Sequence, residues 1–120
     1  MRTICIWVTL VIACTVAVST SYSEPSHNPD SVNGHKLALL ICSACHIAAP
    51  DQNKPPILRT PAVSFQSLAE KEGTSYEGIR NFILTTHQDI SHPKDMPNPM
   101  LTDDEASDIS AYIVSLRRMQ

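Results

Sequence analysis

The most reactive side chains of this 120-residue chain lie together in the string Cys42-Ser43-Ala44-Cys45-His46. Two thiols in a C-x-x-C pair with an imidazole directly after the second can form a disulfide, act as a redox dithiol, bind a metal or attach a prosthetic group. On a helix, Cys42, Cys45 and His46 would share one face, so that two sulfurs and a ring nitrogen would meet one flat object. This geometry favours thioether attachment of a haem, with His46 coordinating its iron.

Three other uses of the Cys pair stay open, but the surrounding sequence supports them less well. A thioredoxin-like dithiol expects a preceding strand in a βαβ setting, and no such pattern is present. A zinc site would add two ligands from His46, His87 and His92, yet ligands on adjacent residues strain a tetrahedral geometry and no second Cys pair accompanies them. A structural disulfide would close only a very short loop.

The first residues have the layout of a secretory signal peptide, with one Arg, an apolar stretch over residues 4–18 and then small polar residues. We expect cleavage near Ser23, so that residues 1–23 form the leader. A membrane anchor competes with this interpretation, but the stretch is shorter than the roughly 20 residues that span a bilayer. Lipidation at Cys14 also competes, although apolar residues continue beyond that Cys. The sequence therefore predicts a periplasmic protein without a stable membrane span.

Export also narrows the chemistry of the Cys pair, because the leader holds Cys5, Cys14 and the only Trp of the chain. The two thiols that remain should either form a disulfide in an oxidising compartment or be consumed by other chemistry. The whole chain has a net charge of −3, and loss of Arg2 with the leader makes the protein more negative. Since no block of Lys or Arg is present, the composition argues against nucleic acid as a partner.

Apolar periodicity predicts helices over residues 32–45, 64–70, 74–87 and from 102 to about 118. Thr74 with Glu77 and Thr102 with Glu105 form candidate capping boxes at two of the starts. The segments between the helices are rich in Pro and therefore irregular. No stretch alternates like a strand, so the predicted fold is all-α, with three to four helices. Its thin apolar core calls for a bound apolar group to complete it.

The mature chain is expected to consist of a short N-terminal arm and a domain that begins with the first helix. Residues 24–31 contain Pro and no apolar period, which predicts a flexible arm before a single domain over residues 32–118. We expect Ser31 or Asn33 to cap the first helix. Leu37, Leu40 and Ile41 fall at helical spacing along it.

Over residues 32–116 the chain resembles a small class I c-type cytochrome, a bacterial monohaem family. Besides the C-x-x-C-H string, the resemblance rests on Gly34, where the family often has a Gly that permits close contact with the C-terminal helix, and on Ile109 and Tyr112, which match the apolar and aromatic pair of that helix. The segment DMPNPMLTDDEASDISAYIVSL resembles the Met-Pro loop that leads into the last helix, and HPKDMP is similar to a bacterial subset. The chain departs from the family at Ala38, where many relatives have an aromatic residue, and in lacking a Trp beyond the leader.

The resemblance implies that Met96, which precedes a Pro, is the second axial ligand of the haem iron. A thioether ligand suits a one-electron carrier because it raises the reduction potential. Met100, His92 and His87 are the alternatives. We expect Met100 to pack beneath the last helix, and His87 to interact with the C-terminal dipole of its own helix.

In this family the carbonyl of a Pro usually accepts a hydrogen bond from the axial His, which fixes the tautomer of the ring. We expect Pro61 in this role, with Pro55 and Pro56 as alternatives. Three polar residues, Lys54, Arg59 and Asn81, are candidates to bind the haem propionates. Each could equally be an ordinary solvated surface residue, so we assign none of them.

The implied function is that of a periplasmic electron carrier, with one covalently attached haem c and no catalysis of its own. It would dock transiently on redox partner proteins at the haem edge near Cys42 and Cys45, and we expect a monomer. Two alternatives stay open. One is a dedicated haem subunit or electron acceptor of a periplasmic dehydrogenase, and the other is a haem-based gas-binding module in which the bond from Met96 is weak.

Overall fold

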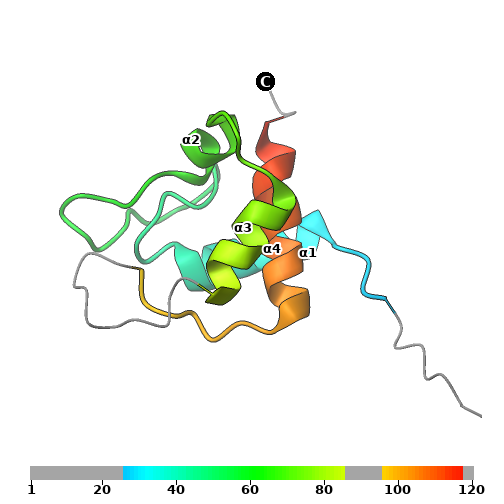
Figure 1. Ribbon diagram of the computed structural model, residues 1–120. Helices are drawn as coiled ribbons and strands as arrows, with labels where there is room; N and C mark the ends of the chain where they lie inside the picture. The colour runs from blue at the N-terminus through cyan, green and yellow to red at the C-terminus, as the bar shows by residue number, and fades with distance from the viewer. Residues whose placement is uncertain (1–25, 86–95, 118–120) are drawn as a thin grey trace, which may run out of the picture.

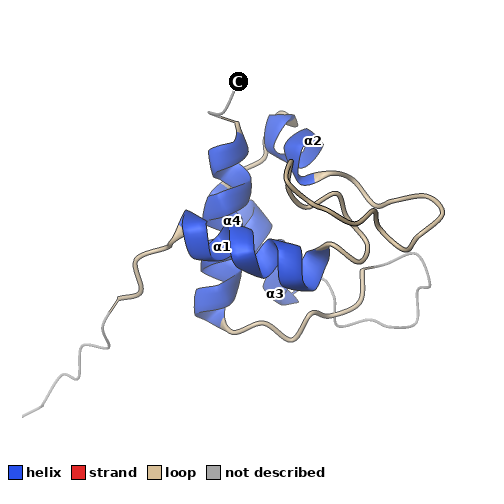
Figure 2. Cartoon of the chain, turned by 180° about the vertical axis from the view of Figure 1, so that it is seen from behind, coloured by secondary structure: helices blue, strands red, loops and turns tan. Residues whose placement is uncertain are grey.

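The computed structural model describes residues 26–85 and 96–117, which form helices joined by irregular loops (Figures 1 and 2). The elements in chain order are α1 (Ser31–Leu37), the π-helical segment η1 (Ala38–Cys42), α2 (Phe65–Glu70), α3 (Tyr76–Thr85) and α4 (Asp103–Leu116). Within these two ranges the extended pairing is limited to an isolated bridge between His46 and Ala62. The predicted all-α fold is therefore confirmed. The predicted leader, His87 and His92 lie outside the described residues.

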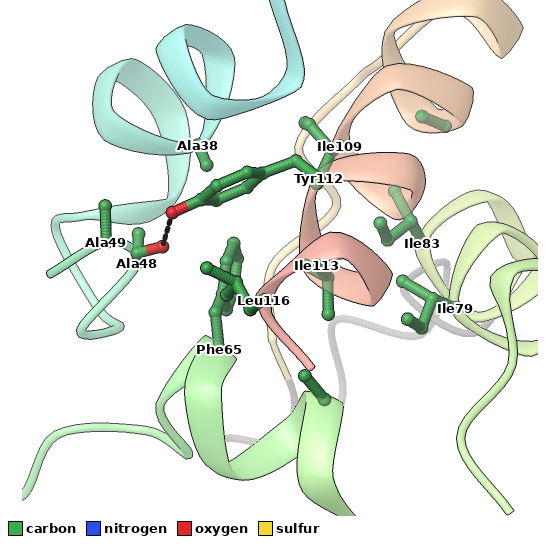
Figure 3. Packing of buried hydrophobic residues seen from close by; sticks show 12 residues of the cluster. Ala38, Ala48, Ala49, Phe65, Ile79, Ile83, Ile109, Tyr112, Ile113 and Leu116 are labelled. Atoms are coloured by element: carbon green, nitrogen blue, oxygen red, sulfur yellow. Dashed lines mark hydrogen bonds between the residues drawn. The ribbon is translucent and has the colours of Figure 1, made fainter. Parts of the chain in front are cut away.

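Helix α4 is the centre of the fold, because it packs against α1, α2 and α3 (Figure 1). Its most extensive contact is with α1. The long loop between η1 and α2 extends away from α4 in both views (Figures 1 and 2). Figure 3 shows the buried cluster, in which Tyr112 reaches toward Ala48 and donates a hydrogen bond to its carbonyl oxygen at 3.2 Å. On the other side of α4, Ile113 faces Ile79 and Ile83 of α3.

Gly34 permits the close contact between α1 and α4. A Cβ atom at this position would lie 2.0 Å from the carbonyl oxygen of Asp108 and 2.9 Å from the Cβ of Tyr112. Any larger residue would therefore push the two helices apart. The contact expected from the resemblance, in which Gly34 lies against the last helix, is confirmed.

The start of α1 is capped by Asp30, which precedes both of the predicted cap residues. The side chain of Asp30 accepts hydrogen bonds from the backbone amides of Val32 and Asn33, at 2.8 and 3.3 Å. The prediction of Ser31 or Asn33 as the cap is therefore wrong by one or more residues. Asp is as good a cap as Ser or Asn, so residue preference alone does not separate the candidates.

The other helix starts agree with the sequence to different degrees. Thr102 and Glu105 form the predicted capping box at α4. At α3, however, the hydroxyl of Ser75 accepts the amide of Gly78 at 3.0 Å, so the cap lies one residue after the predicted Thr74. Either hydroxyl satisfies an amide of the first turn, and the local chain direction decides which one is used.

The first helix ends differently from the prediction, since η1 replaces its last α-helical turn and ends at Cys42. A π-helical turn is wider than an α-helical one, so the side chains rotate away from the 3.6-residue period. This explains why Leu40, which fits the helical pattern, is 81% exposed. The hydroxyl of Ser43 then donates to the carbonyl oxygen of Leu39 at 2.6 Å, at the end of the segment.

Two Arg side chains join α4 to its neighbours. Arg117 donates from Nε to the carbonyl oxygen of Ala69 at 2.8 Å and from Nη2 to that of Thr74 at 3.0 Å. Arg80 of α3 donates to the hydroxyl of Ser107 at 3.2 Å. These contacts hold α2 and α3 beside α4, where they form the walls of a cavity.

Candidate haem site

A cavity of about 380 Å³ lies between four parts of the chain. These are the end of η1, helix α2 with the segment before it, helix α3, and helix α4. Its walls are mainly apolar and include Phe65, Leu68, Ile79, Ile83, Ile109 and Ile113. Cys42, His46 and Met96 line the same cavity. Cavities that take small molecules and cofactors usually measure roughly 300–1,000 Å³ and are mostly apolar with a few polar groups. The cavity thus brings three of the predicted site residues together.

His46 is the polar group best placed to act on an occupant of the cavity. Its side chain is almost fully buried, and Nδ1 donates a hydrogen bond to the carbonyl oxygen of Val63 at 2.7 Å. The ring also packs against Phe65, with centroids 5.3 Å apart. Because Nδ1 carries the proton in this bond, Nε2 has its lone pair available, and no described residue pairs with it. This is the arrangement that an axial imidazole ligand requires.

The prediction that the carbonyl of Pro61 supports His46 is wrong, since Val63 supplies the acceptor. The residues around the bridge between His46 and Ala62 explain the difference. The amide of Ala62 donates to the carbonyl oxygen of Cys45 at 2.9 Å. The amide of Phe65 donates to the carbonyl oxygen of Ile47 at 3.0 Å. This parallel pairing places the carbonyl of Val63 at the ring, while Pro61 lies exposed before the paired segment. No motif in the sequence indicates such a pairing.

The two cysteines occupy a hydrogen-bonded turn, not the continuous helix in which they were expected. The carbonyl oxygen of Cys42 accepts the amides of both Cys45 and His46, at 3.1 and 2.9 Å. Cys42 lines the cavity, whereas Cys45 is half-buried in the turn and is not part of the cavity wall. Burial, and then the neighbouring Cys45, raise the pKa of the Cys42 thiol to about 11. Cys42 is therefore protonated at neutral pH.

The structure separates the two candidate Met ligands. Met96 lines the cavity, but Met100 is 84% exposed and has a positive φ of 55°. The amide of Met100 donates to the side chain of Asn98 at 2.9 Å, in the turn before α4. The expectation that Met100 packs beneath the last helix is therefore wrong.

The polar residues considered for the haem propionates do not line the cavity. Lys54, Arg59 and Asn81 are all exposed. Apart from Cys42 and His46, the polar residues that do line it come from the connection between α2 and α3, and they are Lys71, Thr74 and Ser75. The sequence pattern indicates Thr74 only as a helix cap, and Lys71 and Ser75 belong to no recognisable motif.

An apolar cavity beside a C-x-x-C-H turn, in a small all-α fold, defines the class of c-type haem proteins. The family model for cytochrome c matches residues 31–117, and the chain belongs to this family as a class I c-type cytochrome. The chain is similar to a cytochrome c-552 of Bradyrhizobium diazoefficiens, with 36% identity over 104 residues, which are 87% of this chain and 91% of that protein. No solved structure matches the chain significantly.

Membership of the family confirms the predicted cofactor, covalently attached haem c. It also supports haem-based electron transfer. The apolar walls and the free Nε2 of His46 fit such a flat group with one axial imidazole. In the part of the chain that the structure describes, no helix has both the length and the apolar character needed to cross a membrane.

Proposed function

We propose that the protein is a periplasmic electron carrier in which Cys42 and Cys45 attach one haem c and His46 and Met96 are its axial ligands. The observation that carries the proposal is that His46 and Met96 line the same apolar cavity. Met100, the other candidate thioether, is exposed and outside that cavity. A His/Met pair suits one-electron transfer because it favours the reduced state.

The bound haem supplies an iron that changes its oxidation state by one electron. The protein residues hold the group and shape its surroundings. Val63 orients the ring of His46 through the bond to Nδ1 and increases the basicity of the ligand. Ile109 and Ile113, both almost fully buried, exclude water from the cavity and so tune the reduction potential.

Apolar side chains near the attachment turn support docking at this edge. Leu40 and Ile57 are 81% and 83% exposed, and the amide of Ile57 donates to the carbonyl oxygen of Ala44 at 2.9 Å, which places Ile57 beside the two cysteines. The exposed cations Lys54 and Arg59 belong to the same loop. A redox partner would bind here through a small apolar contact, as expected for a transient complex.

The remaining parts of the proposal concern export and assembly. Residues 1–23 are the leader, 24–31 the arm and 32–118 the haem domain, and the mature protein is a monomer without catalysis of its own. The described part of the arm has contacts that support its place next to the domain, and one of them is the hydrogen bond that the amide of Asp30 donates to the carboxylate of Asp108 at 2.7 Å. Nε2 of His27 lies 2.6 Å from the carboxylate of Asp108 in α4.

The proposal is tested by the visible spectra of the haem-loaded wild type, Met96→Ala and Met100→Ala. We expect Met96→Ala alone to lose the low-spin His/Met spectrum, because its side chain lines the cavity. Met100→Ala is the matched control, since it removes the same side chain at an exposed position. Loss of the spectrum in Met100→Ala alone would contradict the axial assignment. Rapid carbon monoxide binding to the reduced wild type would instead favour the gas-binding alternative.

A further inference from the structure

The loop that follows His46 contains a side chain with an unusual set of backbone contacts. Gln52 is half-buried, and its Oε1 accepts the amide of Ala48 at 2.8 Å. Its Nε2 donates to the carbonyl oxygens of Lys54, at 2.7 Å, and Ser43, at 3.3 Å. One carboxamide thus satisfies three backbone groups from three places in the chain.

These contacts surround the attachment turn. Ser43 lies between the two cysteines, and Ala48 lies shortly after His46, so Gln52 connects the segment before Cys45 to the segment after His46. On the other flank, Ala62 pairs with the backbone of Cys45, and Val63 holds the ring of His46. The turn is therefore held from two sides, and Gln52 supplies one of them.

The chemistry of these contacts is specific to a Gln side chain. The site requires one acceptor and two donors at the end of a two-carbon stem, and only the Gln carboxamide offers both at this length. A Glu in its ionised form retains the acceptor for Ala48 but directs a negative charge at the carbonyl oxygens of Ser43 and Lys54. An Ala leaves all three backbone groups without this partner.

We propose that Gln52 is a positioning residue for haem attachment, which holds Cys45 and His46 in the geometry that the cofactor needs. The inference rests on the proposed function, which assigns attachment to these residues. Each thioether forms when a thiol S–H adds across a vinyl group, with sulfur bonding one carbon and hydrogen the other. The addition requires no external oxidant or reductant. Its rate depends on how well the thiol and the iron-bound His46 are held in register, which is the task of Gln52.

The first test measures the fraction of exported chain that carries denaturation-resistant haem, in wild type, Gln52→Ala and Thr102→Ala, each with its leader. We expect Gln52→Ala to lower this fraction at least about fivefold, the factor that loss of even one of the three hydrogen bonds would give. Thr102→Ala removes the α4 cap away from the attachment turn and controls for lost stability. We expect it to keep the wild-type fraction.

The second test is a pH profile on haem-loaded protein that does mature. In Gln52→Glu, the thermal midpoint should fall furthest below that of wild type at about pH 8 and recover toward about pH 5, as the carboxyl gains a proton that it can donate. Asn53→Asp adds the same charge at the neighbouring exposed position and should show no such recovery. A purely space-filling role for Gln52 would not produce this difference.

The outcomes separate the two proposals. Suppose that wild type carries resistant haem and that Gln52→Ala either carries the same fraction or loses no more of it than Thr102→Ala does. Gln52 is then not a positioning residue, and the proposed function stands. A flat pH profile for Gln52→Glu also overturns the inference. If wild type itself carries no resistant haem, the proposed function fails.

Discussion

A single missing side chain at Gly34 determines how closely α1 and α4 approach, since a Cβ there would lie 2.5 Å from the carbonyl carbon of Asp108. We expect Gly34→Ala to lower the free energy of unfolding by about 3 kcal/mol, because backbone atoms cannot yield as a flexible side chain would. Denaturant titration of the haem-loaded protein measures the loss. Val32→Ala, at an exposed position on the same helix, should change it by less than about 0.5 kcal/mol. Equal stability of the two variants would show that the helices separate at no cost.

Asp108 has the most buried carboxylate of the contact between α1 and α4. It accepts hydrogen bonds from the side chain of Asn33 and the amide of Asp30, both at 2.7 Å, and lies 2.6 Å from Nε2 of His27. Burial alone would raise the pKa of Asp108, but these hydrogen bonds outweigh burial and hold the pKa below the ordinary value of 3.8. The bond to Asp108 in turn raises the pKa of His27 above 6.5.

These two shifts predict a pH window for the arm. Asp108 stabilises the fold above pH 3.8, and its contribution is lost as the pH falls through its lowered pKa. His27 stabilises the fold fully below pH 6.5, and this stabilisation is lost as the pH rises through its raised pKa. The stability difference between wild type and His27→Ala should therefore be largest between these two values and smaller above them. Thermal unfolding across pH measures it, and in an Asp108→Asn background the effect of His27→Ala should depend much less on pH, because only the weaker interactions of His27 with Asp104 and Asp30 remain.

Sequence reasoning located residues that type and spacing identify. A family position indicates Gly34, whose close contact with α4 is confirmed, and a motif indicates His46, which lines the cavity. Sequence reasoning failed at Val63 and Gln52, because a backbone carbonyl has no residue preference and a side-chain contact to three backbone groups has no motif. Pro61 was selected by analogy with the family, but the pairing of Ala62 with Cys45 brings a later carbonyl to the ring.

Among the helices, α4 has the strongest start signal. The hydroxyl of Thr102 accepts the amide of Glu105, and the carboxylate of Glu105 accepts the amide of Thr102 at 2.8 Å. We expect Thr102→Ala to lower the free energy of unfolding by about 1 kcal/mol, the usual value of a lost cap. Ser64→Ala removes the cap of the short helix α2 and serves as a comparison. A loss at Ser64 greater than that at Thr102 would contradict the central role of α4.

How accurately the sequence predicts where a helix begins and ends has a physical cause in each case. Periodicity located α2 and α4 within a residue or two, since amphipathic stripes and caps agree there. It extended the first helix past Cys42, because a π-helical turn preserves the apolar composition but not the 3.6-residue spacing. Ser43, whose hydroxyl competes for the carbonyl of Leu39, is a local signal for that end, although Ser is too common to identify it alone.

For the whole molecule, the cofactor is part of the core. The sequence predicted a thin core, and the structure places the gap between α3 and α4, where Ile79, Ile83, Ile109 and Ile113 line both the buried cluster and the cavity. The same side chains therefore hold the helices together and would contact a haem bound in the cavity. The folding of the chain and the binding of its cofactor should consequently be coupled.

This coupling predicts the behaviour of the chain without haem. An enclosed void of about 380 Å³ would cost about 9 kcal/mol at roughly 24 cal/mol per Å³, which is the upper bound for this partly open cavity, and small domains have only about 5–15 kcal/mol of stability. The double variant Cys42→Ala/Cys45→Ala, prepared without haem, should therefore retain part of its far-UV helical signal but lose near-UV dichroism and bind a hydrophobic dye. Haem-loaded wild type, treated identically, should unfold cooperatively and bind no dye. If the haem-free variant unfolds cooperatively at the wild-type midpoint, the cavity closes by repacking of α3 on α4, and the haem contributes electron transfer without supporting the fold.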